Sequence, residues 1–210
     1  MDQKPDYGID APNVIRNLSI VSVISLILAF VMPDINFSNV HVIFFQMWIS
    51  LFISCGLMAL LMIMYSKYGK LVQRDKMLAM IEWKGNEKVL DVGTGKSLLM
   101  IGAAKKLSAG KSYGIDIWRK SDISSNAINS TMKNAEEENV LKKIEILEED
   151  ARNMSFESDF FDVILSNVCL HNIDTKEDRR KACGDRPCSK TRRNRSDSGF
   201  YPHLILQKSF

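Results

Sequence analysis

A glycine turn near the middle of the chain is the first feature whose residues could carry chemistry. In the sequence VLDVGTGKS, Gly93 and Gly95 separate an apolar, β-branched run from a helical pattern that extends to Leu107. Glycine turns of this kind let backbone N–H groups approach a ligand, and the start of the next helix favours negative charge. Three nucleotide chemistries use such a turn, so the spacing of the motif must distinguish them.

Two of these chemistries fit the spacing poorly. A dinucleotide motif that starts at Gly93 needs a small residue at position 98, where Leu98 would block the close approach of helix and strand. A phosphate-binding loop, G-x-x-x-x-G-K-[ST], matches at its GKS end, but its first glycine falls on Leu90. We therefore keep a P-loop nucleotide-binding protein only as an alternative.

Alternating strands and helices must position this turn. Short apolar or β-branched runs predict strands over 88–92, 112–118, 144–150 and 160–170. Amphipathic spacing predicts a helix over 124–141, in addition to the helix that follows the glycine turn. Strands that alternate with helices indicate an α/β domain with a parallel sheet, here of about four strands.

Four motifs accompany these strands in a fixed order. They are VLDVGTG, GID at 114–116, EDA at 149–151 and FDVILSN at 161–167. Together they resemble the class I S-adenosylmethionine-dependent methyltransferases, and the resemblance covers residues 71 to about 173. It implies a Rossmann-like parallel sheet with the cofactor, S-adenosyl-L-methionine, above the C-terminal ends of the strands.

The resemblance implies a role for each residue of the first two motifs. Asp91, Gly93 and Gly95 would shape the methionine end of the cofactor pocket, because a Cβ at either glycine would collide with the cofactor. Asp116 would accept hydrogen bonds from both ribose hydroxyls. The family usually has a third glycine where this chain has Ser97, whose hydroxyl we expect to cap the following helix.

The other two motifs would face the adenine and the methyl group. By the same resemblance, Asp150 would bind the adenine amino group, and the Ala151 backbone N–H would bind the adjacent ring nitrogen. Asn167, next to Ser166, would end the fourth strand beside the transferred methyl. His171 is the candidate catalytic base for acceptors that must lose a proton, with a helix-start role as its alternative. Each strand-end carboxylate could instead be a solvated acid or a helix cap.

Charge and composition narrow the function classes. Residues 81–178 carry 18 acidic and 13 basic side chains, whereas residues 179–210 carry nine basic and two acidic ones. The small net charge of +3 therefore says little about partners, and we expect no nucleic-acid binding. An apolar share of 46% with 11 Gly, 5 Pro and 4 Cys excludes collagen-like, disulfide-framework and wholly disordered proteins. The cysteines lack zinc-ligand spacing, so we predict no metal site.

Two uncharged apolar runs, 18–32 and 42–65, precede the glycine turn. The second run would extend about 36 Å as a helix, enough to cross a hydrocarbon core of about 30 Å. Basic residues flank the outer ends of the pair and the connecting loop holds only Asp34, so both ends are predicted to be cytoplasmic. Serines in both runs could mediate helix contact. We predict a multi-pass membrane hairpin. A cleaved signal peptide, one span with an interfacial helix and a buried soluble hairpin are the alternatives.

The C-terminal part departs from the family pattern. The tail beyond about residue 182 lacks a Pro-Gly-Gly turn, and only residues 203–206 could form a short strand. We therefore expect a bare apolar edge on the fourth strand, and we hypothesise a truncated or frame-altered C-terminus. The predicted segments are an N-terminal cytoplasmic segment (1–17), a transmembrane hairpin (18–66), a methyltransferase-like domain (67–178) and a basic, atypical tail (179–210).

These features together predict a membrane-anchored S-adenosylmethionine-dependent methyltransferase whose domain faces the cytoplasm. Its partners would be the lipid bilayer and a small-molecule or lipid-like methyl acceptor. The sequence specifies neither that acceptor nor the oligomeric state. A catalytically inactive, truncated methyltransferase-like membrane protein is the alternative, because the last strands of the family pattern are missing.

Overall fold

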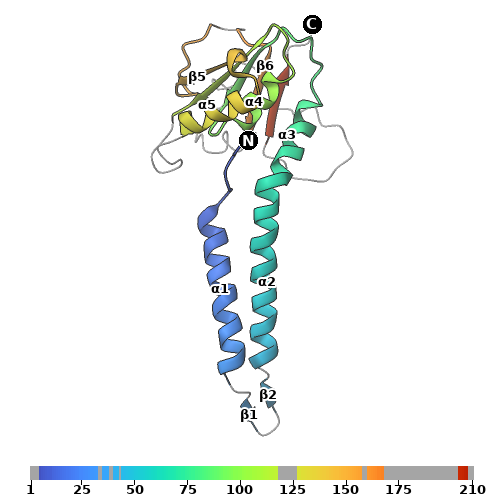
Figure 1. The fold of residues 1–210 in the computed structure, drawn as a ribbon, viewed down its shortest axis with the longest axis vertical. Coiled ribbons are helices and arrows are strands. Elements are labelled where there is room, and N and C mark those ends of the chain that lie inside the picture. The colour runs from blue at the N-terminus through green and yellow to red at the C-terminus, as the bar shows by residue number, and fades with distance from the viewer. Residues whose placement is uncertain are drawn as a thin grey trace. The chain divides into compact units, whose positions relative to one another are not determined.

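The computed structural model describes most of the chain as two compact units. The described residues are 5–32, 35–37, 40–42, 44–117, 127–157, 160–167 and 203–207. One unit is Gly8–Val72, and the other comprises the described residues before Gly8 and from Gln73 onward. Figure 1 labels helices and strands of both units where there is room. The first unit holds the two apolar runs, and the second holds the glycine turn.

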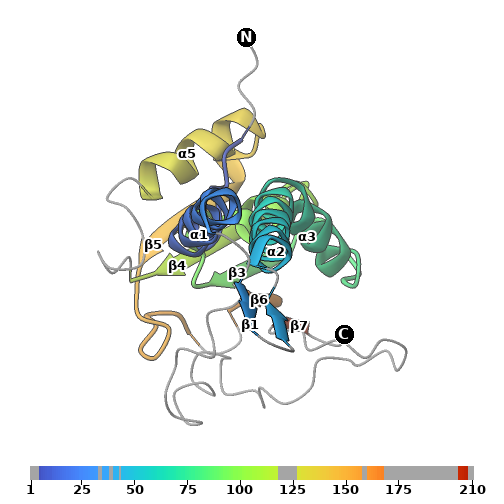
Figure 2. The same ribbon diagram turned by 90° about the horizontal axis from the view of Figure 1, so that it is seen from below.

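The Gly8–Val72 unit contains a helical hairpin whose two long helices lie side by side (Figure 2). Its elements are α1 (Pro12–Val31), β1 (Ile35–Phe37), β2 (Val40–Val42), α2 (Phe44–Met64) and a π-helical turn, η1 (Tyr65–Gly69). The strands β1 and β2 pair with each other antiparallel between the two helices. The chain then continues from η1 into α3 (Lys70–Leu78).

Small residues form the contact between α1 and α2. The buried side chains of α1 recur at helical spacing: Ile15, Ser22, Ser25 and Ala29. The Ser22 Oγ donates a hydrogen bond of 2.9 Å to the Phe52 carbonyl oxygen, and a Cβ at Gly56 would lie 3.0 Å from that Oγ. The predicted contact role is confirmed for Ser22. The hydroxyls of four other serines bond to carbonyls of their own helices: Ser19, Ser25, Ser50 and Ser54.

By length and composition, the apolar helices could cross a membrane. Large apolar side chains are exposed on both helices, as Phe30 on α1 and Ile53 on α2 illustrate. A core helix of a soluble protein or a signal sequence can have the same length and composition, so the helices alone are weak evidence for a membrane span.

The second unit is built on a five-stranded sheet. Its strands are β3 (Lys88–Val92), β4 (Lys111–Asp116), β5 (Ile144–Glu148), β6 (Val163–Asn167) and β7 (His203–Gln207). Their order across the sheet is β5-β4-β3-β6-β7. The strands from β5 to β6 in this order are parallel, which confirms the predicted four-strand parallel sheet of the methyltransferase type. The glycine turn follows β3, which lies at the centre of the sheet.

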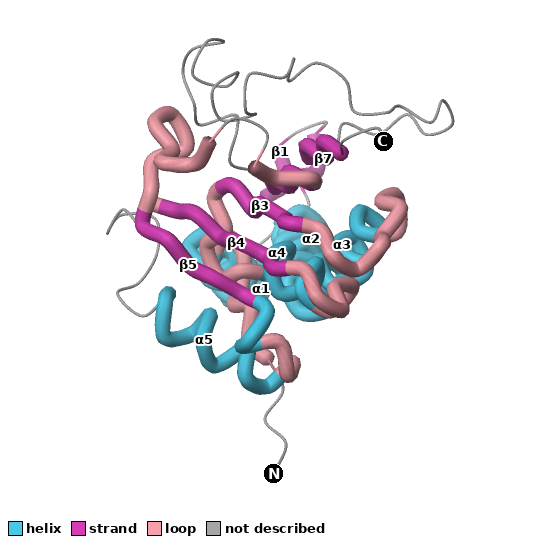
Figure 3. The backbone as a smooth tube through the Cα atoms, turned by 90° about the horizontal axis from the view of Figure 1, so that it is seen from above, coloured by secondary structure: helices cyan, strands magenta, loops and turns pink. Residues whose placement is uncertain are grey.

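The described helices of this unit cover one face of the sheet (Figure 3). They are α3, α4 (Leu98–Ala104) and α5 (Ala127–Glu137), and a 3-10 turn, η2 (Leu141–Lys143), leads into β5. Alternate residues of β3 face opposite sides, as the two-residue period of a strand requires. Val89 packs with Leu78 and Leu99 on the helical side, whereas Leu90 packs with Phe161 on the other side. β3 is therefore buried on both faces of the sheet.

The strand β7 corrects the prediction of a bare sheet edge. It pairs antiparallel with β6, from Val163 opposite Gln207 to Asn167 opposite His203. The apolar edge of β6 is therefore covered by a segment from the tail that the local sequence pattern identified only as a possible short strand. The second strand ends at Asp116, the acid predicted at its tip. Other predicted boundaries differ: α5 ends at Glu137 rather than at residue 141, β5 ends at Glu148 rather than at residue 150, and β6 begins at Val163 rather than at residue 160.

Candidate functional site

Backbone hydrogen bonds join the glycine turn to the neighbouring strand, β4. The N–H groups of Gly93 and Thr94 both donate to the Ile115 carbonyl oxygen, at 2.9 and 3.1 Å. Gly93 and Gly95 have φ values of +72° and +52°, in the left-handed region that glycine adopts without a steric penalty. The turn thus requires both glycines for its backbone conformation, independently of any ligand.

Asp91 lies beneath this turn and supports it. Its side chain is 2% exposed, and its Oδ2 accepts hydrogen bonds from the Thr94 hydroxyl (2.9 Å) and the Met100 N–H (3.0 Å). Burial raises the pKa of the Asp91 carboxyl from 3.8 to about 7, although both hydrogen bonds act in the opposite direction. Asp91 therefore joins the end of β3, the turn and the first residues of α4.

Asp116 points toward the turn from the end of β4. Its Oδ2 accepts a hydrogen bond of 2.9 Å from the Gly95 N–H. This bond brings together the two features that the predicted cofactor pocket requires, the glycine loop and the acid that ends the second strand of the motif series. The predicted ribose contact of Asp116 stays a prediction.

Ser97 adopts a conformation that normally favours glycine. Its φ is +64°, its side chain is fully buried, and it makes no side-chain cap to α4. The expectation that Ser97 caps the helix is therefore wrong. Its Oγ lies 3.1 Å from both Thr94 Oγ1 and Thr131 Oγ1, and the Thr131 hydroxyl lies 3.5 Å from the Gly95 carbonyl oxygen. A hydroxyl network thus replaces the cap and links the turn to α5.

The end of β6 contributes one polar atom without a partner. Asn167 Oδ1 is buried, and it makes no hydrogen bond within the described part of the chain. A buried acceptor in this condition is costly unless a ligand satisfies it. The adjacent Ser166 is 1% exposed and donates its hydroxyl to the Val92 carbonyl oxygen (3.2 Å), so it serves the sheet.

The residues predicted to hold adenine follow β5. Asp150 accepts hydrogen bonds from the backbone N–H and the Nε of Arg152, both at 2.9 Å. Ala151 is partly buried against the core that contains Leu90. Both adenine contacts stay predictions, and the Arg152 guanidinium would have to share the Asp150 carboxylate with a bound adenine. The candidate base His171 lies outside the described residues.

A comparison with protein families identifies the family of this chain. A family model described as ribosomal protein L11 methyltransferase (PrmA) matches residues 76–180, half of the chain. The chain belongs to this family of class I S-adenosylmethionine-dependent methyltransferases. The match includes the glycine turn, all four parallel strands and the predicted site residues.

Solved structures also match this methyltransferase domain. An S-adenosylmethionine-dependent methyltransferase from Aquifex aeolicus is 20% identical, with a TM-score of 0.44, over 53% of this chain and 56% of that one. The YcgJ protein from Bacillus subtilis is 20% identical, with a TM-score of 0.42, over 52% and 42%. A TehB-like methyltransferase from Corynebacterium glutamicum is 17% identical, with a TM-score of 0.37, over 52% and 50%. The chain spans about half the length of these structures. No curated protein sequence matches it.

The sequence alone did not identify three residues of the methyltransferase site. Thr94 and Thr131 form the hydroxyl network, and Gly114 lies opposite Asp91 in the register of β3 and β4. A Cβ at Gly114 would lie 2.6 Å from Met100 Sδ and 2.9 Å from Thr94 Oγ1. The GID motif contained the signal for Gly114, because a glycine inside a strand often marks a close approach. No local pattern connects Thr131 with the turn.

The same geometry disfavours the P-loop alternative. A P-loop uses the hydroxyl that follows its lysine to hold Mg²⁺ beside bound phosphates. Here the corresponding hydroxyl, that of Ser97, is fully buried against Thr94 and Thr131. It therefore serves the packing of the turn in this methyltransferase and does not face a ligand.

Proposed function

We propose that this chain binds S-adenosyl-L-methionine above the C-terminal ends of β3, β4 and β6 and transfers its methyl group to an acceptor. The observation that supports this proposal is the hydrogen bond from the Gly95 N–H to Asp116, which holds the acid that we propose to bind the ribose against the glycine turn. The unpartnered Asn167 Oδ1 at the end of β6 supports it, because a cofactor amino group could satisfy that acceptor. The residues present therefore fit the cofactor that the family uses.

When bound, S-adenosyl-L-methionine supplies a methyl group activated by a positively charged sulfur. Transfer of that group is an in-line displacement, so the protein contributes chiefly by orienting the two reactants and by excluding water. We assign orientation of the ribose to Asp116 and accommodation of the methionine part to the turn at Gly93 and Gly95. Asn167 would accept a hydrogen bond near the reacting end. His171 is proposed to remove a proton only where the acceptor requires it.

We further propose that the hairpin anchors the methyltransferase in a bilayer, with its domain on the cytoplasmic side. The support is the length and apolar surface of α1 and α2 and the basic residues that follow α2, which include Lys67, Lys70 and Arg74. An anchored enzyme would meet acceptors that are themselves held in the membrane, such as lipid-like molecules. Small soluble acceptors would reach the same site. A methyl-transfer assay with both kinds of acceptor is therefore needed to identify the acceptor.

Calorimetry on the full, detergent-solubilised chain tests cofactor binding. The parent is expected to bind S-adenosyl-L-methionine, and Asp116→Ala is expected to lose about 1.5–3 kcal/mol of binding free energy, the range for hydrogen bonds to a charged group. That loss weakens the affinity about 13- to 160-fold. Glu145→Ala is the matched control, because Glu145 is a partly exposed acid that pairs with Lys111 at the N-terminal ends of β5 and β4, opposite the C-terminal ends where the cofactor is proposed to bind.

Three results would separate the possible failures. An absence of both heat and a thermal shift at millimolar cofactor would end the methyltransferase proposal. Cofactor binding without methyl transfer to membrane lipids or to a small-molecule extract would favour the alternative of a catalytically inactive methyltransferase-like protein. Unchanged affinity in Asp116→Ala, with binding intact in the parent, would show that the ribose lies elsewhere.

A further inference from the structure

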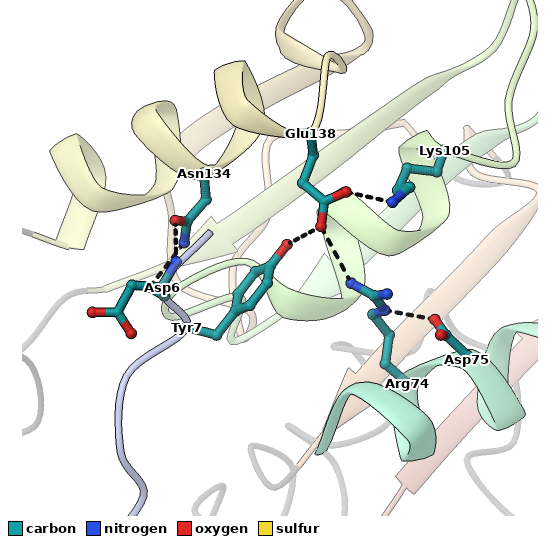
Figure 4. Close-up of polar contacts among 7 residues, drawn as sticks. All are labelled: Asp6, Tyr7, Arg74, Asp75, Lys105, Asn134 and Glu138. Atoms are coloured by element: carbon teal, nitrogen blue, oxygen red, sulfur yellow. Dashed lines mark hydrogen bonds and ion pairs between the residues drawn. The ribbon is translucent and has the colours of Figure 1, made fainter. Parts of the chain in front are cut away.

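A short segment at the beginning of the chain is bound to α5 (Figure 4). The Asp6 backbone N–H donates to Asn134 Oδ1 at 2.8 Å, and Asn134 Nδ2 donates to the Asp6 carbonyl oxygen at 3.1 Å. One side-chain amide thus satisfies both backbone groups of one residue. Asn134 is 2% exposed, so losing either bond would leave a buried polar group without its partner.

The next residue extends the attachment by one helical turn. Tyr7 is 7% exposed, and its hydroxyl donates to Glu138 Oε1 at 3.3 Å. Burial and the nearby Glu138 carboxylate raise the pKa of Tyr7, so the hydroxyl keeps its proton and stays a donor. Glu138 also pairs with Lys105 after α4, and Arg74 of α3 lies 3.9 Å away (Figure 4).

The same helix braces the glycine turn. Thr131 precedes Asn134 by three residues, a spacing that places both side chains on one face of α5. Thr131 is fully buried and contacts Ser97 Oγ at 3.1 Å and the Gly95 carbonyl oxygen at 3.5 Å. Successive turns of α5 therefore contact the glycine turn and the Asp6–Tyr7 segment.

α5 depends on such contacts for its position. It has 11 residues, fewer than an isolated helix needs to be stable in water. Its sequence, AINSTMKNAEE, includes Asn, Ser and Thr, which have modest helix propensity. Ile128 and Met132 on its surface are about half exposed, so they bury only part of their apolar area. The hydrogen bonds that Asn134 and Thr131 make to other parts of the domain thus help to hold the helix in position.

We propose that residues 5–7 act as a strap that fixes α5 and, through Thr131, sets the position of the glycine turn for cofactor binding. Asn134 and Thr131 are then positioning residues, neither of which needs to touch the cofactor. Tyr7 secures the end of the same helix through Glu138. The part of this inference that concerns cofactor affinity rests on the proposed function, whereas the link from strap to turn does not.

Hydrogen exchange on the full chain, without cofactor, tests the link itself. Asn134→Ala is expected to accelerate amide exchange in a peptide that covers Gly95–Ser97, because α5 is released from the strap. Tyr7→Phe removes a single hydroxyl and should produce a smaller change of the same kind. Lys133→Ala is the matched control, since the Lys133 side chain is exposed on the same helix and makes only a 4.0 Å pair with Glu137.

A double-mutant cycle on cofactor affinity tests the route. Asn134→Ala and Thr131→Val are each expected to raise the Kd for S-adenosyl-L-methionine by about three- to tenfold, and the double variant by less than the product of the two effects. Thr131→Ser keeps the hydroxyl and should restore the affinity lost in Thr131→Val. A merely structural role for Thr131 would not distinguish Ser from Val in this way.

The outcomes separate the strap from the proposed function. Faster exchange at Gly95–Ser97 in Asn134→Ala supports the strap even if the parent binds no cofactor, a result that would defeat the proposed function alone. Unchanged exchange at the turn in Asn134→Ala, or fully multiplicative effects in the cycle, would overturn the strap while leaving cofactor binding by the parent intact. If Asn134→Ala fails to fold, the Tyr7→Phe exchange measurement decides.

Discussion

The buried carboxyl of Asp91 predicts how the stability of the domain depends on pH. Its pKa is raised to about 7 in the folded protein, against 3.8 for an ordinary aspartate, so the folded state holds a proton that the unfolded chain releases near pH 4. The stability contributed by this group is therefore greatest below about pH 4, and it falls as the pH rises to about 7. We expect Asp91→Asn to remove this dependence.

Thermal unfolding of the parent and of Asp91→Asn between pH 5 and pH 8 measures the effect. As the pH rises, the Tm of the parent should fall relative to the Tm of Asp91→Asn. The expected change in this difference is several degrees over the range, for a change of about 1 kcal/mol or more in stability. An asparagine keeps an oxygen that can accept from Thr94 and Met100, so the variant should fold. A Tm difference that stays constant across the range would refute the assignment.

At the residue scale, the sequence was informative wherever chemistry depends on a local motif. Gly93, Gly95 and Asp116 come together as their motifs predicted, because a parallel β3–β4 pair places the end of one strand beside the turn after the other. Ser97 was misassigned because its hydroxyl partner, Thr131, lies 34 positions away on another helix. Such pairs follow from tertiary packing, which the spacing of neighbouring residues does not encode.

At the element scale, the pairing of β7 with β6 should protect the domain from association. Removal of residues 203–210 would expose the edge of β6, where Val163 and Leu165 belong to a buried core. We expect the shortened protein to form soluble aggregates or larger species in detergent. Size-exclusion chromatography with light scattering measures this, and removal of residues 208–210 alone serves as the control. A shortened protein as monodisperse as the parent would show that β7 is dispensable for the edge.

Strand and helix types were more predictable than strand partners. The four parallel strands could be placed from short apolar or β-branched runs bounded by turns, most clearly for β3 and β6, which are largely buried. β7 was identified only as a possible strand, and its pairing was missed, since 35 residues separate β6 from it and no local periodicity specifies a partner. The ends of α5, β5 and β6 differ from the predicted ones by a few residues, because tertiary contacts decide where a helix or strand stops and local patterns do not encode them.

At the scale of the whole molecule, the hairpin and the methyltransferase domain differ in where their apolar side chains lie. The hairpin exposes large apolar side chains along both helices, whereas the domain buries most of its apolar residues in cores on the two faces of the sheet. An apolar surface of this extent in water would favour association, and a bilayer would satisfy it. A charge introduced on the hairpin should therefore be costly if the hairpin lies in a bilayer and harmless if it lies in water.

Ile53→Arg distinguishes these environments. Ile53 lies near the middle of α2 and is 56% exposed, so an arginine there would be harmless on a water-facing helix. In a bilayer the same change costs about 2.5–3.5 kcal/mol at the centre of a span. We expect the fraction that resists alkaline extraction from membranes to fall in this variant. Val72→Arg, at a similarly exposed residue of α3, should leave that fraction unchanged. Equal extraction of both variants and the parent would place α2 outside the hydrocarbon core, because no bilayer interior accepts that charge without cost.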